Sequence, residues 1–308
     1  MLKKIKQSSY LYIPGIYLLL AAAAVTASPL IGAETLNFRH IIHDLLNGEI
    51  SHTDTIIFVY QRLPRVLLAF LTGAVLAVSG STFQVILRNP LATPYTLGVT
   101  GGAAVGAYLA IAFPVLAKIA GKAGSVQFMS MAGAGIIVLF IYNVSRGKHR
   151  VSMHTMLLAG VTVSIMCGAL IILIRYLTNP HLLVSLDRWT MGRLDTIGYD
   201  CFYSVLPLAA VGLILIGMHT RSLNLLCLGE EMAMGHGVDT ASVQKYCFLG
   251  ASIATAAVVS AAGPIGFIGL ISPHVVRRIS GHDNKTVMYG CFLLGGAFLV
   301  LCDTLART

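Results

Sequence analysis

Arginines and one pair of adjacent acids are charged groups of this chain that could form contacts with another molecule. Arg62 and Arg65 stand three positions apart, Arg307 lies near the carboxyl end, and Glu230 and Glu231 are the only neighbouring acids among 308 residues. A guanidinium group binds a carboxylate through two parallel N–H groups and keeps its charge at physiological pH. Anchoring at a membrane–water boundary is the simpler role for these arginines.

Residues for covalent or metal chemistry show no organisation. The six cysteines are scattered without a CxxC pair, and the ten histidines are no better ordered, so the sequence supports neither a disulfide framework nor a metal cluster. No nucleophile stands with a base, and the GxxxxGK[ST] phosphate loop is missing. We therefore predict that the chain is not an enzyme, does not hydrolyse ATP, and binds no metal or cofactor of its own.

The composition is that of a membrane protein. Hydrophobic residues make up 56% of the chain and charged residues 11%, too few charges to cover a soluble surface of this size. Apolar runs near the length that crosses a bilayer recur throughout. They lie at about 11–31, 64–87, 95–117, 126–145, 152–175, 200–218, 242–262, 264–280 and 287–303. We predict one all-α domain over 1–308, a polytopic bundle of about nine transmembrane helices with an uncleaved first helix.

The basic residues indicate how the chain is oriented. If the amino terminus is cytoplasmic and each run crosses once, the inner loops hold 12 of the 21 Lys and Arg residues and only four acids. The outer side then holds the other nine basic residues and eight acids. This is the positive-inside pattern, so the net charge of +9 reflects topology, and we expect no nucleic-acid partner.

Glycine and proline interrupt two apolar stretches. The stretch 263–278 reads GPIGFIGLISPHVVRR, and hydrocarbon offers no partner for the backbone groups that such residues release. It must therefore pack against other helices or line a wet cavity, either in a transporter or as a kinked core helix of a membrane enzyme. The stretch 62–106 carries many glycines, which permit close helix approach in lipid.

The two interrupted stretches share their spacing, which suggests an inverted repeat. In each, a basic residue precedes a glycine by 18 positions and a proline follows that glycine by ten. The triplets are Arg62, Gly80, Pro90 and Lys245, Gly263, Pro273.

The pattern of the longest inner loop, 219–245, predicts a segment that binds a partner protein. Helix-forming residues run from Leu223 to Met234, and Gly235 and Gly237 end them. An amphipathic helix lying on the membrane without a partner is the alternative.

Four segments together resemble the FecCD-like family, the permeases of ABC importers for iron–siderophore complexes, haem and cobalamin. GPIGFIGLISPH is similar to the family signature GPIGFxGLxxPH, and the stretch from Arg62 to Gly106 is similar to RLPR followed by NPLAxPxxLGxxxGA. LNLLCLGEEMAMGHGV resembles the coupling loop LNxLxLGEExAxxLGV, and CDTLART resembles ADxxAR. Family members normally have ten helices, whereas this sequence stops at Thr308, so we expect a nine-helix form to be less stable and a poorer transporter than a ten-helix form.

The resemblance implies the transmembrane subunit of a type II ABC importer in a bacterial inner membrane. Two copies would form a homodimer, join two cytoplasmic ATPases that hold ATP and Mg²⁺, and receive cargo from an extracytoplasmic binding protein. The expected cargo is an iron–siderophore complex, then haem, then cobalamin. A secondary transporter or a membrane-embedded enzyme is the alternative, but no Asp, Glu, Lys or Arg falls in the middle of any predicted span.

The resemblance also assigns roles to residues. Arg62, Arg65 and Arg307 would pair with acids on the two lobes of the binding protein. The ATPase-coupling positions are Leu228, Gly229, Glu230, Glu231, Met232, Ala233, Gly235 and Gly237. The helix-break and gating positions are Asn89, Pro90, Gly98, Gly263, Pro264, Gly266, Gly269 and Pro273.

Overall fold

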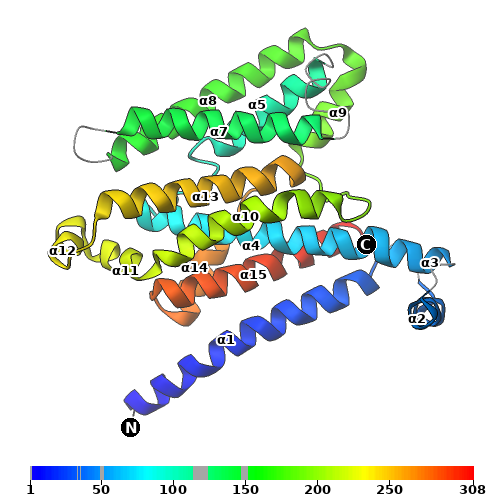
Figure 1. Cartoon of the computed structure of the whole chain (residues 1–308), viewed down its shortest axis with the longest axis horizontal. Coiled ribbons are helices and arrows are strands. Elements are labelled where there is room, and N and C mark those ends of the chain that lie inside the picture. The colour runs from blue at the N-terminus through cyan, green and yellow to red at the C-terminus, as the bar shows by residue number, and fades with distance from the viewer. Residues whose placement is uncertain (1, 33, 35, 49–51, 114–123, 147–151) are drawn as a thin grey trace.

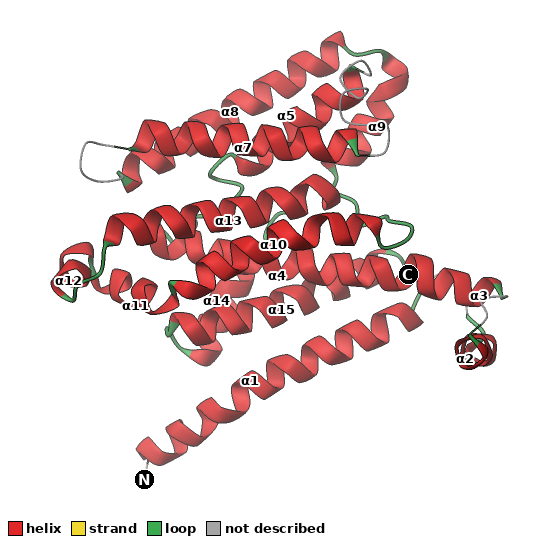
Figure 2. Cartoon of the chain, viewed as in Figure 1, coloured by secondary structure: helices red, strands yellow, loops and turns green. Residues whose placement is uncertain are grey.

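The computed structural model of the chain describes residues 2–32, 34, 36–48, 52–113, 124–146 and 152–308, and the elements among them are helices (Figure 2). They are α1 (Leu2–Ala27), η1 (Ser28–Leu30), α2 (Phe38–Asn47), α3 (Thr53–Ile56), the π-helical η2 (Ile57–Arg62), α4 (Leu63–Ile86), α5 (Val99–Ala112), α7 (Ser125–Ser145), α8 (Met153–Leu177), α9 (Pro180–Thr190), α10 (Asp200–Met218), α11 (Thr220–Leu228), α12 (Glu230–Gly235), α13 (Thr240–Ala262), α14 (Ile268–Ser280) and α15 (Asn284–Ala306).

The prediction of an all-helical membrane bundle is confirmed. A helix coincides with each of the nine predicted runs, as far as the described residues reach. Within that part of the chain, six helices are long and apolar enough to cross a membrane: the continuous helix Thr53–Ile86, α7, α8, α10, α13 and α15. The expectation of nine full-length spans was too simple, because α5 has 14 residues and α14 only 13. Their runs include backbone that Gly and Pro keep out of the helix.

The long helices lie side by side and divide the bundle into two ends (Figure 1). The amino terminus, α11 and α12 lie at one end, which we call the amino-terminal end. The carboxyl terminus, α2, α3 and α9 lie at the other, the carboxyl-terminal end. The groups that were predicted on opposite sides of a membrane are therefore at opposite ends of the bundle.

α4 is the central helix. It packs against α13, α14 and α15. In the most apolar 18-residue stretch of the helix that contains it, 89% of the residues are buried, against 22% for the corresponding stretches of α8 and α10. The outer helices instead expose apolar side chains, and Leu158, Ile165 and Ile172 on α8 are each 70% exposed. Such a surface fits hydrocarbon and not water.

Glycine lets the central helices touch backbone to backbone. A Cβ atom built on Gly80 of α4 would overlap the carbonyl oxygen of Gly269 on α14, and one on Gly73 would overlap the carbonyl oxygen of Gly295 on α15. Close packing is the main attraction between helices in lipid, where apolar side chains gain nothing from leaving the solvent. The predicted role of the small residues of α4 is confirmed at these two positions.

A π-helical stretch precedes α4, and its released carbonyls find partners on another segment. Pro64 has no N–H group, so the last turn before it leaves carbonyl oxygens without an intrahelical donor. The Tyr60 oxygen accepts from the Gly198 N–H at 2.7 Å, and the Val59 oxygen accepts from the Tyr199 hydroxyl at 3.0 Å. The loop that leads into α10 thereby closes the gap.

The spacing that suggested an inverted repeat does not mark equivalent positions. Gly80 lies inside α4, whereas Gly263 ends α13. Pro90 lies in the loop after α4, whereas Pro273 lies inside α14. The equal distances along the sequence are therefore a coincidence of spacing at these residues.

The Gly80 contact yields a first prediction. Gly80→Ala should lower the melting temperature of the detergent-purified chain, because α4 and α14 must separate to admit the methyl group. Overpacking of this kind costs about 1–3 kcal/mol. Gly168→Ala on α8 is the matched control, since nothing lies within 4 Å of a Cβ atom there. Equal melting temperatures for the two variants would show that the α4–α14 contact is not tight.

Candidate functional site

Two helix breaks that lie far apart in the sequence meet beside α4. The first is the segment 87–98 between α4 and α5, and the second is the segment 263–267 between α13 and α14. Their facing residues line a cavity of about 20 Å³. The lining includes Leu76 near the middle of α4, Thr93, Pro94 and Tyr95 from the first break, and Ile265, Gly266 and Phe267 from the second. This volume suits about one water molecule, so the breaks are packed against each other in this conformation.

The first break is a sequence of turns. The Asn89 side chain accepts a hydrogen bond from the Leu91 N–H at 2.9 Å, a bond that favours a turn at Pro90. The segment ends at Gly98, whose φ of +73° suits glycine and which directly precedes α5. Gly98 also lies against Gly160 and Val163 of α8. The predicted break at Asn89, Pro90 and Gly98 is therefore present.

The second break is held by the segment that follows α9. Gly263 has a φ of +72°, and its N–H closes α13 on the Val259 carbonyl at 2.8 Å. The Ala262 carbonyl, which the break releases, accepts from the Arg193 N–H at 2.7 Å. Pro264 follows within the same irregular backbone. The prediction that this stretch needs partners inside the protein is confirmed.

Phe267 closes the second break in an uncommon conformation. Its φ is +66°, a left-handed value that costs a bulky residue about 1–3 kcal/mol, and its side chain is 76% exposed. Gly266 precedes it and has open space around its Cα atom. A change of backbone conformation at Phe267 would relieve this strain, so this residue beside the break cavity is a position where the backbone can switch between two conformations.

A polar cluster joins α14 to α4, and it corrects one expectation. Pro273 does not break a helix, since α14 continues through it. Pro273 leaves the Gly269 carbonyl without its usual donor, and the Gln84 side-chain amide donates to that oxygen at 3.3 Å. Arg277 in turn donates to the Gln84 side-chain oxygen and, at 3.1 Å, to the Ser81 hydroxyl. Gln84 thus repairs the proline defect and is oriented by Arg277.

The predicted coupling loop contains two short helices. A single helix from Leu223 to Met234 was expected, but Gly229, with a φ of +128°, separates α11 from α12. Gly235 is the last residue of α12, and Gly237 has a φ of +77° in the turn that follows. The segment also ends earlier than residue 245, because α13 begins at Thr240.

The two short helices expose an apolar surface at the amino-terminal end. Leu228 is 62% exposed and Met232 55%, and Glu231 is exposed beside them, whereas Ala233 is buried and fastens α12. Glu230 faces inward, accepting from the Gln244 side chain at 3.0 Å with Arg88 at 3.9 Å. Of the two adjacent acids, only Glu231 is free to meet a partner.

α11 is also tied to α15. The Asn224 side-chain amide donates to Asp283 at 2.7 Å, and its oxygen accepts from the Asn284 N–H at 2.8 Å. Burial raises the pKa of Asp283, but hydrogen bonds from Asn224 and Thr286 outweigh it and leave this pKa below its usual value. A displacement of α11 would therefore pull on the start of α15, which packs against α4.

The three predicted docking arginines bind groups of their own chain. Arg62 is 6% exposed and donates to the Pro29 carbonyl at 3.0 Å and to the Glu34 carbonyl. Arg65 forms a two-pronged ion pair with Asp303 of α15, at 2.9 and 2.7 Å. Arg307 donates to the Ser28 hydroxyl at 2.7 Å. Arg62 therefore cannot present its guanidinium group to a partner in this conformation, whereas the Arg65 side chain is 27% exposed.

Two arginines that the sequence analysis passed over are more open. Arg188 on α9 and Arg193 after it are exposed, and both line a cavity of about 630 Å³ at the carboxyl-terminal end.

Asn179 followed by Pro180 is a helix-start signal that predicts α9: the Asn179 side chain accepts from the His181 N–H at 3.2 Å.

Broken helices packed inside an apolar bundle, with short exposed helices at one end, define a polytopic membrane transport protein. The family model described as the FecCD transport family matches residues 19–308.

The cobalamin import system permease protein BtuC of Halobacterium salinarum is 37% identical over 265 residues, covering 84% of this chain and 68% of that protein. The hemin transport system permease protein HmuU of Yersinia pestis is 35% identical over 303 residues, covering 96% and 86%. A solved structure described as an inward-facing conformation of a "putative metal-chelate type ABC transporter" is 28% identical and superposes with a TM-score of 0.81, covering 97% of this chain and 90% of that one.

The chain belongs to the FecCD transport family. It is a multi-pass permease subunit of an ABC importer, and the ATPase of that importer is a separate subunit.

The ion pair between Arg65 and Asp303 yields a second prediction. Arg65→Ala should destabilise the chain by about 1–3 kcal/mol, because Asp303 is 6% exposed and would keep only Arg307 nearby. Adding Asp303→Ala should recover part of the loss. Thermal unfolding in detergent measures both, with the exposed Arg188→Ala as control. If Arg65→Ala unfolds at the control temperature, the pair does not hold α4 to α15.

Proposed function

We propose that this chain is the membrane-spanning subunit of a bacterial importer for iron–siderophore complexes, working as a homodimer in the cytoplasmic membrane. Haem and then cobalamin are the alternative cargoes. The observation that supports the transport role best is the meeting of the two helix breaks around a small cavity. These segments are the places where the backbone can rearrange, because their conformations are set by turns and not by a helical hydrogen-bond ladder.

The amino-terminal end of the bundle is proposed to face the cytoplasm. The basic residues of the inner loops support this orientation through the positive-inside pattern, and Arg88, Lys245 and Arg277 lie at that end or on helices that reach it. The exposed Leu228 and Met232 would then meet the cytoplasmic ATPase, which alone binds ATP and Mg²⁺. Movement would pass through Asn224 to α15 and through Gln84 and Arg277 to α14.

The carboxyl-terminal end is proposed to receive the extracytoplasmic binding protein. Arg65 keeps part of its guanidinium group exposed, and Arg188 and Arg193 add two open cations for acids on that partner. Arg62 and Arg307 would not touch the binding protein. They would support docking by holding the segment around Ser28, Pro29 and Glu34 in place. The exposed apolar face of α8 leaves room for a second copy of the chain or for lipid.

The order of cargoes rests on the resemblance to the family, and the relatives supply the same three candidates. The relatives described as permeases for hemin and cobalamin are 35% and 37% identical to this chain, and a probable iron chelatin permease of Helicobacter pylori is 33% identical. The three cargoes that these relatives name belong to one chemical class. All three are large metal chelates, and the uncharged break residues would sort them by size and shape.

Uptake into proteoliposomes tests the function. The chain would be co-expressed with its neighbouring ATPase and binding-protein genes, reconstituted, and given a ferric siderophore, haem or cobalamin with the loaded binding protein outside. ATP-dependent accumulation of the ferric siderophore alone is the expected result. Uptake without ATP under an ion gradient would instead indicate a secondary transporter, and ATP-driven uptake of haem or cobalamin would replace the proposed cargo.

The coupling surface yields a third prediction. Leu228→Asp combined with Met232→Asp should reduce co-purification of the ATPase at least about tenfold, because an apolar contact would have to bury two charges. Met191→Asp is the matched control: Met191 is 82% exposed but lies just after α9, at the other end of the bundle.

The two adjacent acids, Glu230 and Glu231, are expected to contribute in different ways. Glu231→Ala should weaken ATPase stimulation by loaded binding protein directly, whereas Glu230→Ala should act by loosening α12 from Gln244. Unchanged stimulated ATPase activity in the variant with both glutamates replaced would remove the coupling role from this surface.

A further inference from the structure

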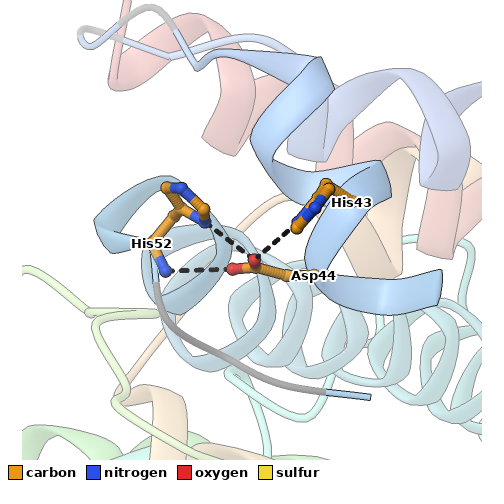
Figure 3. A group of neighbouring side chains, drawn as sticks. All are labelled: His43, Asp44 and His52. Carbon is orange, nitrogen blue, oxygen red and sulfur yellow. Dashed lines mark hydrogen bonds and ion pairs between the residues drawn. The ribbon is translucent and has the colours of Figure 1, made fainter. Parts of the chain in front are cut away.

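Three histidines and two aspartates gather around α2 and the start of α3 at the carboxyl-terminal end (Figure 3). His43 and Asp44 lie on α2 and His52 directly precedes α3, and one ligand atom from each lies within 4.8 Å of the other two. His40 lies one turn earlier on α2 and stacks on His52, with ring centroids 4.4 Å apart. The histidines that look unordered in the sequence are brought together by the fold.

Asp44 is the centre of the cluster. Its side chain is 1% exposed, and one carboxylate oxygen accepts from the His52 N–H at 2.9 Å and the Thr55 hydroxyl at 2.8 Å. The other oxygen, Oδ1, is 2.7 Å from Nδ1 of His52 and 3.7 Å from Nδ1 of His43. Figure 3 shows both imidazole rings directed at this oxygen from opposite sides. A buried carboxylate is thus fixed between two imidazoles, with its position set by backbone and hydroxyl donors.

We propose that His43, Asp44 and His52 form a binding site for a divalent transition metal of the Zn²⁺ class. Two imidazole nitrogens and one carboxylate oxygen suit Zn²⁺, Ni²⁺ or Cu²⁺, whereas Mg²⁺ and Ca²⁺ require more oxygen ligands. Ligand atoms around a tetrahedral Zn²⁺ lie about 3.3 Å apart, given bonds of about 2.0–2.1 Å. The 2.7 and 3.7 Å distances bracket this value, so small side-chain shifts admit the ion.

The surroundings supply access and support. The His43 side chain is 67% exposed, which opens the cluster to solvent and leaves a fourth coordination position for water. His40 is held by Asp54 at 2.9 Å and backs the His52 ring. The metal would take the place of the hydrogen bond between Asp44 and His52, and a neutral His52 ring bound through Nδ1 would carry its proton on Nε2. The bound metal would link α2 to the start of α3. The metal site is independent of the proposed function and cargo.

Direct metal binding tests the site. The full chain would be purified with an affinity tag that contains no histidine, treated with chelator and titrated with Zn²⁺ alone by calorimetry and with Co²⁺ by visible absorption. His43→Ala is the diagnostic variant, because it leaves the bonds among Asp44, His52 and Thr55 in place. Asp44→Asn is the second variant, and His154→Ala, an exposed histidine on α8, is the control.

The expected result is one Zn²⁺ per chain for the wild type and for His154→Ala, with affinity lowered more than about 100-fold in His43→Ala. Wild-type protein should also show the absorption of four-coordinate Co²⁺ and a Zn²⁺-dependent rise in melting temperature. Equal binding by His43→Ala and wild type, or no binding by the wild type, would overturn the proposal. In that case the cluster is only a hydrogen-bonded tie between α2 and α3.

Discussion

Every break in a helix of this protein has to find its backbone partners inside the bundle, because the lipid offers none. The structure meets this demand three times with groups from distant segments. The Gly198 N–H bonds the carbonyl exposed before Pro64, the Arg193 N–H bonds the carbonyl released at Gly263, and the Gln84 amide bonds the carbonyl that Pro273 leaves open. Two of the three donors, Arg193 and Gly198, belong to the segment between α9 and α10. This segment therefore supplies backbone hydrogen bonds to two different helix breaks.

This constraint explains the arrangement of the remaining helices. The broken segments require close neighbours, so α4, α13, α14 and α15 form a dense centre in which glycine allows backbone contact. The helices α7, α8 and α10 lie outside with apolar side chains exposed. The same broken segments are the least regular backbone in the centre. They can change conformation without unfolding a long helix, which suits a transport path.

Charged groups are placed where they hold the ends of this assembly. Arg65, Arg307 and Asp303 join α4 to α15 at the carboxyl-terminal end, and Arg277 joins α14 to α4 toward the amino-terminal end. Arg65 and Asp303 form a partly buried ion pair, in which loss of one partner leaves the other charge uncompensated. Arg277 instead binds the neutral side chains of Gln84 and Ser81. The Gln84 amide, oriented by Arg277, binds the carbonyl of Gly269, which itself lines the break cavity.

The sequence by itself determined the class of fold, the order of the apolar helices and the two places where helices break, because hydropathy and Gly/Pro content act locally. It could not show which groups satisfy the breaks, since Gln84 and Gly269 are 185 positions apart. For the same reason it did not show that Arg62 binds backbone carbonyls of an earlier segment, nor that His43, Asp44 and His52 gather in space. Only tertiary structure decides such pairings, because a side chain's partner depends on which helices pack together and in which register.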